Sequence, residues 1–269
     1  MEKKVAIVTG AAGGIGRAIV AGFLHAGYAI ALVDREEDSM KAAIPHGEET
    51  AADLLFLPGD LCDDAFLQEL VTRVMDKWGR IDALVNNAMW RKVESIRESS
   101  PDDWNKTLAI GITAPAFLSK YVAEVVLEKQ QKCCIINLSS VMSSLVSGYA
   151  SAYSICKGAM ESLTYELATT YGPYGCRAIA VRPGSVDTSM SQDYQSTSGD
   201  NISQQIQAEI EDRTPLKRSA KPEEIAQAIV WLCTEQAGFI TGTCLTIDGG
   251  LEHNFNSYSM KHRLKPDTF

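Results

Sequence analysis

The sequence is poor in the features that mark secreted and metal-binding proteins. Its seven cysteines are odd in number and include no Cys-x-x-Cys pair, so they do not form the pattern of a disulfide framework. We interpret them as buried thiols. Metal-ligand spacing is also missing among the four histidines and between them and the cysteines, so we expect no required metal; these histidines are His25, His46, His253 and His262.

Positive charge and long apolar runs are scarce as well. The chain carries 25 Lys and Arg against 34 Asp and Glu, a net charge of -9 that disfavours nucleic acid and anionic membrane surfaces as partners. Its first apolar run, 5–8, is too short and too early for a secretory signal, and no window approaches the roughly 20 apolar residues of a membrane span. We therefore expect a cytoplasmic protein.

Short apolar runs alternate instead with longer amphipathic stretches. Asp63 and Gly79 are typical of the two ends of one helix, while Ser100 and Pro222 mark the starts of two others. Several of the apolar runs are continuous, as in strands buried on both faces; the predicted strands are 5–9, 29–34, 54–59, 81–86, 133–138, 177–181 and 243–247. The alternation predicts one doubly wound, Rossmann-type α/β domain over residues 1–250, with a mostly parallel seven-stranded sheet.

Two segments depart from this alternation. Residues 189–214 are polar, lack a strong periodicity and are too long for a simple connection, so we expect a loop that closes over a substrate. Residues 251–269 form a mixed polar C-terminal extension. The sequence leaves open whether this extension is disordered or docks on a neighbouring subunit.

The first predicted strand leads directly into a glycine-rich turn, Thr9-Gly10-Ala11-Ala12-Gly13-Gly14-Ile15-Gly16, followed by a helical run. Gly10, Gly14 and Gly16 allow a tight turn and the close approach of a pyrophosphate to backbone amides. The following helix would present its positive N-terminal end to the same group. Between a strand and a helix, this pattern predicts a dinucleotide site.

The second predicted strand ends in an acid that bears on the choice of dinucleotide. Asp34 follows Gly16 by 18 residues, where a carboxylate can accept hydrogen bonds from the adenosine ribose and would repel a 2′-phosphate. Gly13 supplies no cation for such a phosphate, which favours the same choice. Arg35 argues mildly the other way. We expect NAD, with NADP less favoured.

A tyrosine and a lysine stand four residues apart at Tyr153 and Lys157, and no other tyrosine has a lysine at that spacing. On a helix the two side chains share one face, close enough for the cation to favour phenolate. A phenol with an ordinary pKa near 10 needs such a neighbour to move protons at neutral pH. By itself the spacing is also typical of a solvated helix face.

Together these motifs resemble the short-chain dehydrogenase/reductase family over roughly residues 3–250. Further matches are Gly59-Asp60-Leu61, Asn86-Asn87-Ala88, the serine-bearing strand 136–140, the loop 182–188 and the last strand with its exit, 240–250. The resemblance implies that these residues hold the cofactor: Gly10, Gly14, Ile15, Gly16, Asp34, Asp60, Leu61, Asn87, Ala88, Tyr153, Lys157, Pro183, Gly184, Val186 and Thr188.

The resemblance also implies the catalytic roles. Ser140, 13 positions before Tyr153, would hydrogen-bond the substrate oxygen, with Ser139 as the less favoured choice. Lys157 would bind the nicotinamide ribose and lower the pKa of Tyr153, which would exchange a proton with the alcohol. The family further implies a homotetramer or homodimer. Candidate substrate residues are Met89, Arg91, Met142, Tyr149, Ser185 and Met190, with Ser143 and Leu145 as further lining.

Two positions depart from the family pattern. Gly111 stands where the family has an asparagine that holds a proton-relaying water, and Met89 stands where a glycine is common. We expect a water to fill the space at Gly111, so that Gly111→Asn would leave turnover equal or raise it. For Met89 we expect local packing, with narrowing of the site as the alternative.

These observations favour an NAD-dependent oxidoreductase that interconverts a secondary alcohol and a ketone on a small polar substrate such as a sugar, polyol or hydroxy acid. A 3-oxoacyl-[acyl-carrier-protein] reductase is an alternative, although Asp34, Gly13 and the negative charge oppose NADPH and an acidic carrier protein. A hydroxysteroid substrate stays open. A catalytically idle dinucleotide-binding protein is the alternative from another class.

Overall fold

The computed structural model describes residues 3–44, 53–196 and 198–269. Within these ranges seven strands form one sheet in the order β3-β2-β1-β4-β5-β6-β7, and all six neighbouring pairs are parallel. The strands are β1 (Val5–Thr9), β2 (Ala29–Asp34), β3 (Leu54–Pro58), β4 (Ala83–Asn86), β5 (Cys133–Leu138), β6 (Cys176–Pro183) and β7 (Thr243–Ile247). The predicted doubly wound fold is confirmed, with each expected strand within a few residues of its predicted bounds.

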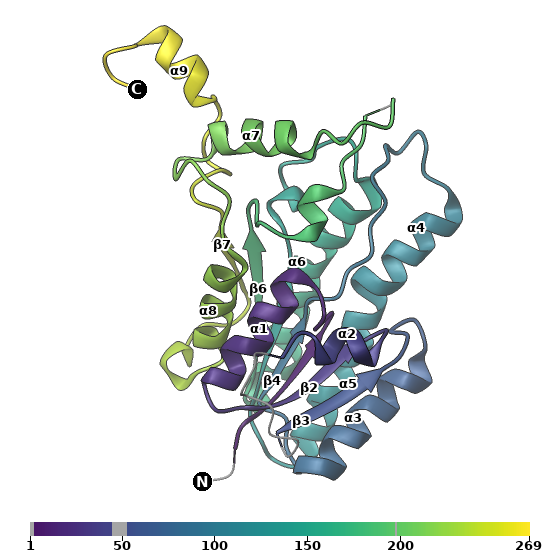
Figure 1. The fold of residues 1–269 in the computed structure, drawn as a ribbon. Coiled ribbons are helices and arrows are strands. Elements are labelled where there is room, and N and C mark those ends of the chain that lie inside the picture. The colour runs from purple at the N-terminus through teal and green to yellow at the C-terminus, as the bar shows by residue number, and fades with distance from the viewer. Residues whose placement is uncertain (1–2, 45–52, 197) are drawn as a thin grey trace.

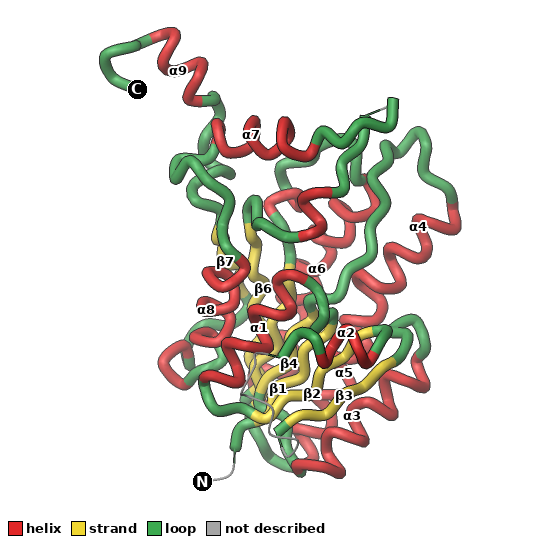
Figure 2. The backbone as a smooth tube through the Cα atoms, viewed as in Figure 1, coloured by secondary structure: helices red, strands yellow, loops and turns green. Residues whose placement is uncertain are grey.

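Helices cover both faces of the sheet (Figures 1 and 2). One face packs against α1 and α8, and the other against α3, α5 and α6. The helices are α1 (Gly14–His25), α2 (Glu37–Lys41), α3 (Asp64–Trp78), α4 (Pro101–Leu108), α5 (Ala114–Glu128), α6 (Ser151–Tyr171), α7 (Ser203–Arg213), α8 (Pro222–Leu232) and α9 (Tyr258–Leu264). Shorter turns are the π-helical η1 (Ala109–Thr113) and the 3-10 segments η2 (Val141–Ser143), η3 (Gly172–Tyr174), η4 (Ser189–Gln192) and η5 (Glu235–Ala237).

The apolar character of the strands follows from burial on both faces. Adjacent residues of a strand point to opposite sides, and Cys133 and Cys134 accordingly join the two different halves of the core. Both thiols are buried and free. The described residues include no group of three or more His, Cys, Asp or Glu side chains that could hold a metal ion, and His46 lies outside them.

Local capping signals place the helix ends where the sequence predicts them. The Asp63 side chain accepts a hydrogen bond from the Ala65 amide, and Gly79 ends α3 in the left-handed conformation with φ of 70°. Ser100 caps α4 by accepting from the Asp103 amide.

One continuous helical run contradicts the expectation about apolar windows. The stretch 101–128, made of α4, η1 and α5, is long and apolar enough by length and composition to cross a membrane, with a mean hydropathy of 1.4. Its apolar side chains pack on the sheet, and Leu118, Val122 and Val126 are fully buried there. The composition is therefore explained by a core helix.

The two irregular segments come together above the carboxyl ends of the strands. Within 189–214, η4 is followed by α7, which crosses over this end of the sheet (Figure 1). The extension 251–269 packs on its own chain: Leu251 is buried, Glu252 bonds to Arg182, and the Ser259 amide bonds to Asp212 of α7. Helix α9 then projects beyond α7.

Candidate active site

A cleft of about 1180 Å³ opens at the carboxyl ends of the strands. The strand order reverses between β1 and β4, which is where open α/β sheets bind ligands. Every residue predicted to bind cofactor, to act in catalysis or to meet substrate lines this cleft, and so does Leu145. Ser143, held within η2, does not line it.

The glycine turn is held against β4 so tightly that side chains would not fit. Gly10 has a φ of 64°, and a Cβ there would lie 2.8 Å from the Cα of Ala88. A Cβ on Gly16 would lie 2.0 Å from the oxygen of Gly10. The Asn87 amide group donates to the oxygens of Thr9 and Gly10, at 3.0 and 3.1 Å. The turn is thus a preformed backbone cradle at the start of α1.

Two carboxylates stand beside this cradle. Asp34, at the end of β2, accepts from the backbone amides of Ala12 at 2.9 Å and Arg35 at 2.8 Å, so it is fixed against the turn. Asp60 accepts from the Cys62 amide at 3.0 Å, and this backbone hydrogen bond lowers the pKa of its carboxyl group. Both groups face the cleft as hydrogen-bond acceptors.

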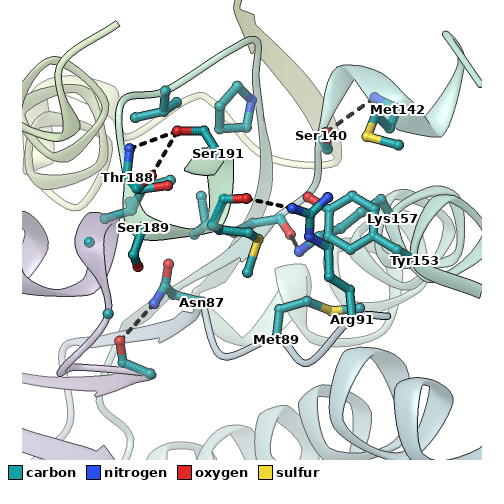
Figure 3. Close-up of a pocket in the computed structure, with 18 of the residues that line it drawn as sticks. Asn87, Met89, Arg91, Ser140, Met142, Tyr153, Lys157, Thr188, Ser189 and Ser191 are labelled. Atoms are coloured by element: carbon teal, nitrogen blue, oxygen red, sulfur yellow. Dashed lines mark hydrogen bonds between the residues drawn. The ribbon is translucent and has the colours of Figure 1, made fainter. Parts of the chain in front are cut away.

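The loop after β6 closes the other side of the cradle. Gly184 passes so near β7's exit that a Cβ would lie 2.8 Å from the Cα of Asp248. A Cβ on Gly14 would likewise meet the side chain of Thr188 at 2.7 Å. The oxygen of Thr188 accepts from the Ser191 hydroxyl, which fixes the start of η4 (Figure 3). The predicted dinucleotide contacts thus surround one space.

The structure separates the two serines that follow β5. The Ser139 hydroxyl is buried and lies 2.6 Å from a carboxylate oxygen of Glu161 and 2.9 Å from the backbone oxygen of Lys157. Ser140 instead acts on the pKa of Tyr153, which it lowers, and its hydroxyl accepts from the Met142 amide at 3.2 Å. Ser140 is therefore the serine that lies beside the phenol.

Burial governs the electrostatics of the pair on α6. It raises the pKa of Tyr153, while the hydrogen bond with Ser140 and the charge of Arg91 oppose that rise. Burial also lowers the pKa of Lys157 to about 8, and its ammonium donates to the Leu138 oxygen at 2.5 Å. The net shift of the Tyr153 pKa in the unliganded site is upward, and Arg91 is the cation that opposes it. That Lys157 lowers this pKa beside a bound nicotinamide stays a prediction.

The substrate end of the cleft is built around Arg91. Its guanidinium carbon lies 6.0 Å from the ring centre of Tyr153 and 4.9 Å from that of Tyr194. Tyr194 in turn meets Tyr149 edge to face, with ring centres 5.6 Å apart. Figure 3 shows Arg91 beside Tyr153 and Lys157. The side chain of Arg91 is only 4% exposed, so it is buried in the cleft wall and not solvated.

The two departures from the family pattern meet in space. A Cβ on Gly111 would lie 2.9 Å from the sulfur of Met89 and 2.9 Å from that of Cys156. The expectation that a water fills the space at Gly111 is therefore wrong, because the side chains of Met89 and Cys156 occupy it. The local-packing interpretation of Met89 is confirmed, and Met89 lines the cleft as well.

Sequence reasoning missed several residues that the segment 189–214 contributes. Tyr194, Ile206, Ile210 and Arg213 line the cleft. Ile206 and Ile210 stand one helical turn apart, a spacing that could have indicated α7. Tyr194 had no such signal, since its contacts with Arg91 and Tyr149 join parts of the chain far apart in sequence.

Comparison with known proteins identifies the family. A family model described as Enoyl-(Acyl carrier protein) reductase matches residues 10–252. An uncharacterized oxidoreductase from Thermotoga maritima is 34% identical over 251 residues, which are 93% of this chain and 97% of that relative. The chain belongs to the short-chain dehydrogenase/reductase family.

Other short-chain dehydrogenases/reductases match over nearly the whole chain. A meso-2,3-butanediol dehydrogenase from Serratia marcescens is 32% identical over 252 residues, covering 93% of this chain and 94% of the relative. The structure of a 3-ketoacyl-(acyl-carrier-protein) reductase from Brucella melitensis, complexed with NADH, has a TM-score of 0.81 at 26% identity and covers 93% and 99% of the two chains. This protein is thus an oxidoreductase of the short-chain dehydrogenase/reductase family, whose members act on alcohol and ketone groups and bind a nicotinamide dinucleotide.

Proposed function

We propose that this protein is an NAD-dependent oxidoreductase that interconverts a secondary alcohol and a ketone on a small polar molecule such as a sugar, polyol or hydroxy acid. The observation that carries the proposal is that Ser140, Tyr153 and Lys157 line the same cleft as the glycine cradle. A protein that only binds a dinucleotide has no need of this arrangement.

In the oxidative direction Tyr153 accepts the hydroxyl proton of the alcohol, and in reduction it returns a proton to the developing alkoxide. Ser140 donates a hydrogen bond to the same oxygen, which stabilises charge as it develops. Lys157 would hold the ribose hydroxyls of a bound nicotinamide dinucleotide next to these groups. A bound nicotinamide supplies the hydride acceptor or donor.

Asp34 supports NAD over NADP. The amides of Ala12 and Arg35 fix its carboxylate beside the cradle. In this position the carboxylate would accept hydrogen bonds from the ribose hydroxyls and would repel a 2′-phosphate. Arg17 and Arg35 also line the cleft, but Arg17 directs its Nε to the oxygen of Ala12 at 2.7 Å. The cofactor contacts are those predicted from the sequence.

We also propose roles for the two irregular segments of the chain. Segment 189–214 acts as the substrate loop of the catalytic domain 1–250, since η4 and α7 line the cleft. Extension 251–269 anchors that end of the domain. We further propose a cytoplasmic homotetramer or homodimer that takes a small-molecule substrate and neither nucleic acid nor membrane.

The test combines a substrate panel with one conservative substitution. Sugars, polyols, hydroxy acids and acyl ketones are assayed with NAD and NADP in parallel by absorbance of the reduced nicotinamide. Tyr153→Phe should retain NADH binding and lose at least about 100-fold in turnover. Tyr174→Phe is the matched control, because it removes a phenol from an exposed position outside the cleft lining and should keep the turnover. Unchanged turnover in Tyr153→Phe contradicts the proposal.

The likeness to the Brucella melitensis reductase favours a second candidate, reduction of 3-oxoacyl groups on an acyl carrier protein. That function predicts faster turnover of a 3-oxoacyl thioester with NADPH than of any small alcohol with NAD. The opposite order supports the first proposal. Turnover of neither class would support the idle dinucleotide-binding alternative.

A further inference from the structure

The Arg91 side chain at the substrate end of the cleft is buried, and it is incompletely paired. Its Nη2 donates to the Met190 oxygen and to Asp193, both at 2.5 Å, and its Nη1 donates to the Tyr194 hydroxyl at 3.1 Å. Its Nε is buried and finds no acceptor among the described residues. An unpaired buried N–H of a guanidinium is costly, so the site is incomplete as it stands.

We propose that Arg91 binds a carboxylate of the substrate, so that the enzyme acts on small hydroxy acids and the corresponding oxo acids. This inference rests on the proposed alcohol and ketone function and names its substrate class. The guanidinium carbon of Arg91 lies 6.0 Å from the centre of the Tyr153 ring, and both residues line the cleft with Ser140. An anion bound by Arg91 would therefore lie near the oxygen on which Tyr153 and Ser140 act. Arg91 is then a specificity-determining residue for the same reaction.

In the unliganded site Asp193 forms an ion pair with Arg91 and so neutralises its guanidinium charge. Its side chain is 48% exposed, whereas the Met190 acceptor belongs to the backbone of η4. Guanidinium groups bind carboxylates through two parallel N–H bonds. A substrate carboxylate that takes Nε and Nη2 therefore displaces Asp193, which can turn into solvent. Asp193 thus acts as an internal competitor for the substrate anion.

The reaction leaves the carboxylate unchanged. Oxidation breaks the C–H and O–H bonds at the alcohol carbon: the hydride, with its two electrons, passes to the nicotinamide, and the proton passes to Tyr153. The charged residues that α7 adds to the lining are Arg213 and Glu209. The two charges balance, so α7 does not cancel the charge that Arg91 offers a substrate carboxylate once Asp193 is displaced.

The experiment compares each acid with its isosteric neutral amide. Values of kcat/KM are measured with NAD for lactate and lactamide, 3-hydroxybutyrate and its amide, and gluconate and its amide. The wild type should prefer the acid in at least one pair. Arg91→Gln should lower that acid-to-amide ratio roughly 10- to 100-fold, with Arg91→Lys between the two. Asp193→Asn should keep or raise the ratio, because it removes the competitor.

Arg97→Gln is the matched control, since it removes the same charge from an exposed position outside the cleft lining and should leave the ratio unchanged. NADH binding by each variant verifies the fold. A wild type that prefers the amides or turns over neutral alcohols alone overturns the inference, as does an equal loss on acid and amide in Arg91→Gln. A wild type without turnover of any alcohol overturns the proposed function instead.

Discussion

Lys157 lies on α6 with its ammonium against the backbone oxygen of Leu138, at 2.5 Å. This burial lowers its pKa to about 8 from an ordinary value of 10.5. The lysine is therefore protonated at neutral pH but loses its charge at a pH that laboratory buffers reach. The sequence predicts Lys157 and its partner Tyr153, whereas the lowering of the lysine pKa depends on burial in the folded chain.

We expect NADH to bind more weakly as pH rises through about 8, because Lys157 then loses the proton with which it holds the ribose hydroxyls. Fluorescence titration with NADH between about pH 6 and 10 measures this. Stability moves the opposite way: the unfolded chain keeps the lysine proton up to about 10.5, so it binds more protons than the folded chain between these values and stability rises with pH.

Lys157→Arg is the control for this prediction, since a guanidinium stays charged over the whole range. Its NADH affinity, even if lower, should lose the change near pH 8. An unaltered pH profile in this variant would assign the titration to another group.

The π-helical turn η1 contains Gly111, one of the two departures from the family pattern, and two neighbouring side chains pack against it. Gly111 stands at its centre, with the sulfur atoms of Met89 and Cys156 in the place of a side chain. Such turns interrupt the regular i to i+4 hydrogen bonding of a helix and often occur at functional sites. Here the side chain of Met89, from the loop after β4, packs against Gly111 within the run from α4 to α5.

Gly111→Asn should therefore destabilise the protein by about 1–3 kcal/mol, because it overpacks a filled space. Adding Met89→Gly should restore part of the loss, with a coupling energy of at least about 0.5 kcal/mol. Urea unfolding of the wild type, both single variants and the double variant measures it. If the two substitutions proved additive, the packing account would be wrong.

A comparison of α3 with α7 indicates which helices can be predicted from the sequence and which cannot. The ends of α3 follow from Asp63 and Gly79, which act on their own backbone and so need no tertiary information. Helix α7 buries little apart from Ser203, and its Ile206 and Ile210 face the cleft. Without a core-facing stripe its pattern is weak, and its position depends on contacts with distant segments, such as that of Asp212 with the Ser259 amide.

At the scale of the whole molecule, one ionic cluster joins three distant parts of the chain. Arg182 of β6 binds Glu161 of α6 through Nε and Nη2, at 3.0 and 2.6 Å, and Glu252 of the C-terminal extension through Nη1, at 2.5 Å. Glu161 approaches Ser139, and Glu252 accepts from Ser144. The cluster therefore braces the chain on both sides of Ser140.

Arg182→Met should lower the free energy of unfolding by about 3–5 kcal/mol, because it leaves two carboxylates without their cation, each with a side chain under about 15% exposed. Combining it with Glu161→Gln and Glu252→Gln should recover part of the loss. Urea unfolding at neutral pH compares the three proteins. A single variant as stable as the wild type would contradict the bracing role.

The same cluster should make the wild type sensitive to acid. Burial raises the pKa of Glu161 and Glu252, but hydrogen bonds, including those from Arg182, outweigh it and lower both values below 4.5. Their contribution is therefore present above about pH 4.5 and lost as pH falls through the lowered values. The triple variant should show a weaker acid dependence.

The position of Glu252 in the chain has a consequence for biosynthesis. Chains emerge from the ribosome in sequence order, and a domain folds as a unit once its parts are available. The glycine cradle and α6 are made early, but the brace on Ser144 needs a residue that comes after β7. A growing chain therefore cannot form this brace until the residues after β7 have been synthesised, so the segment around Ser140 gains it late.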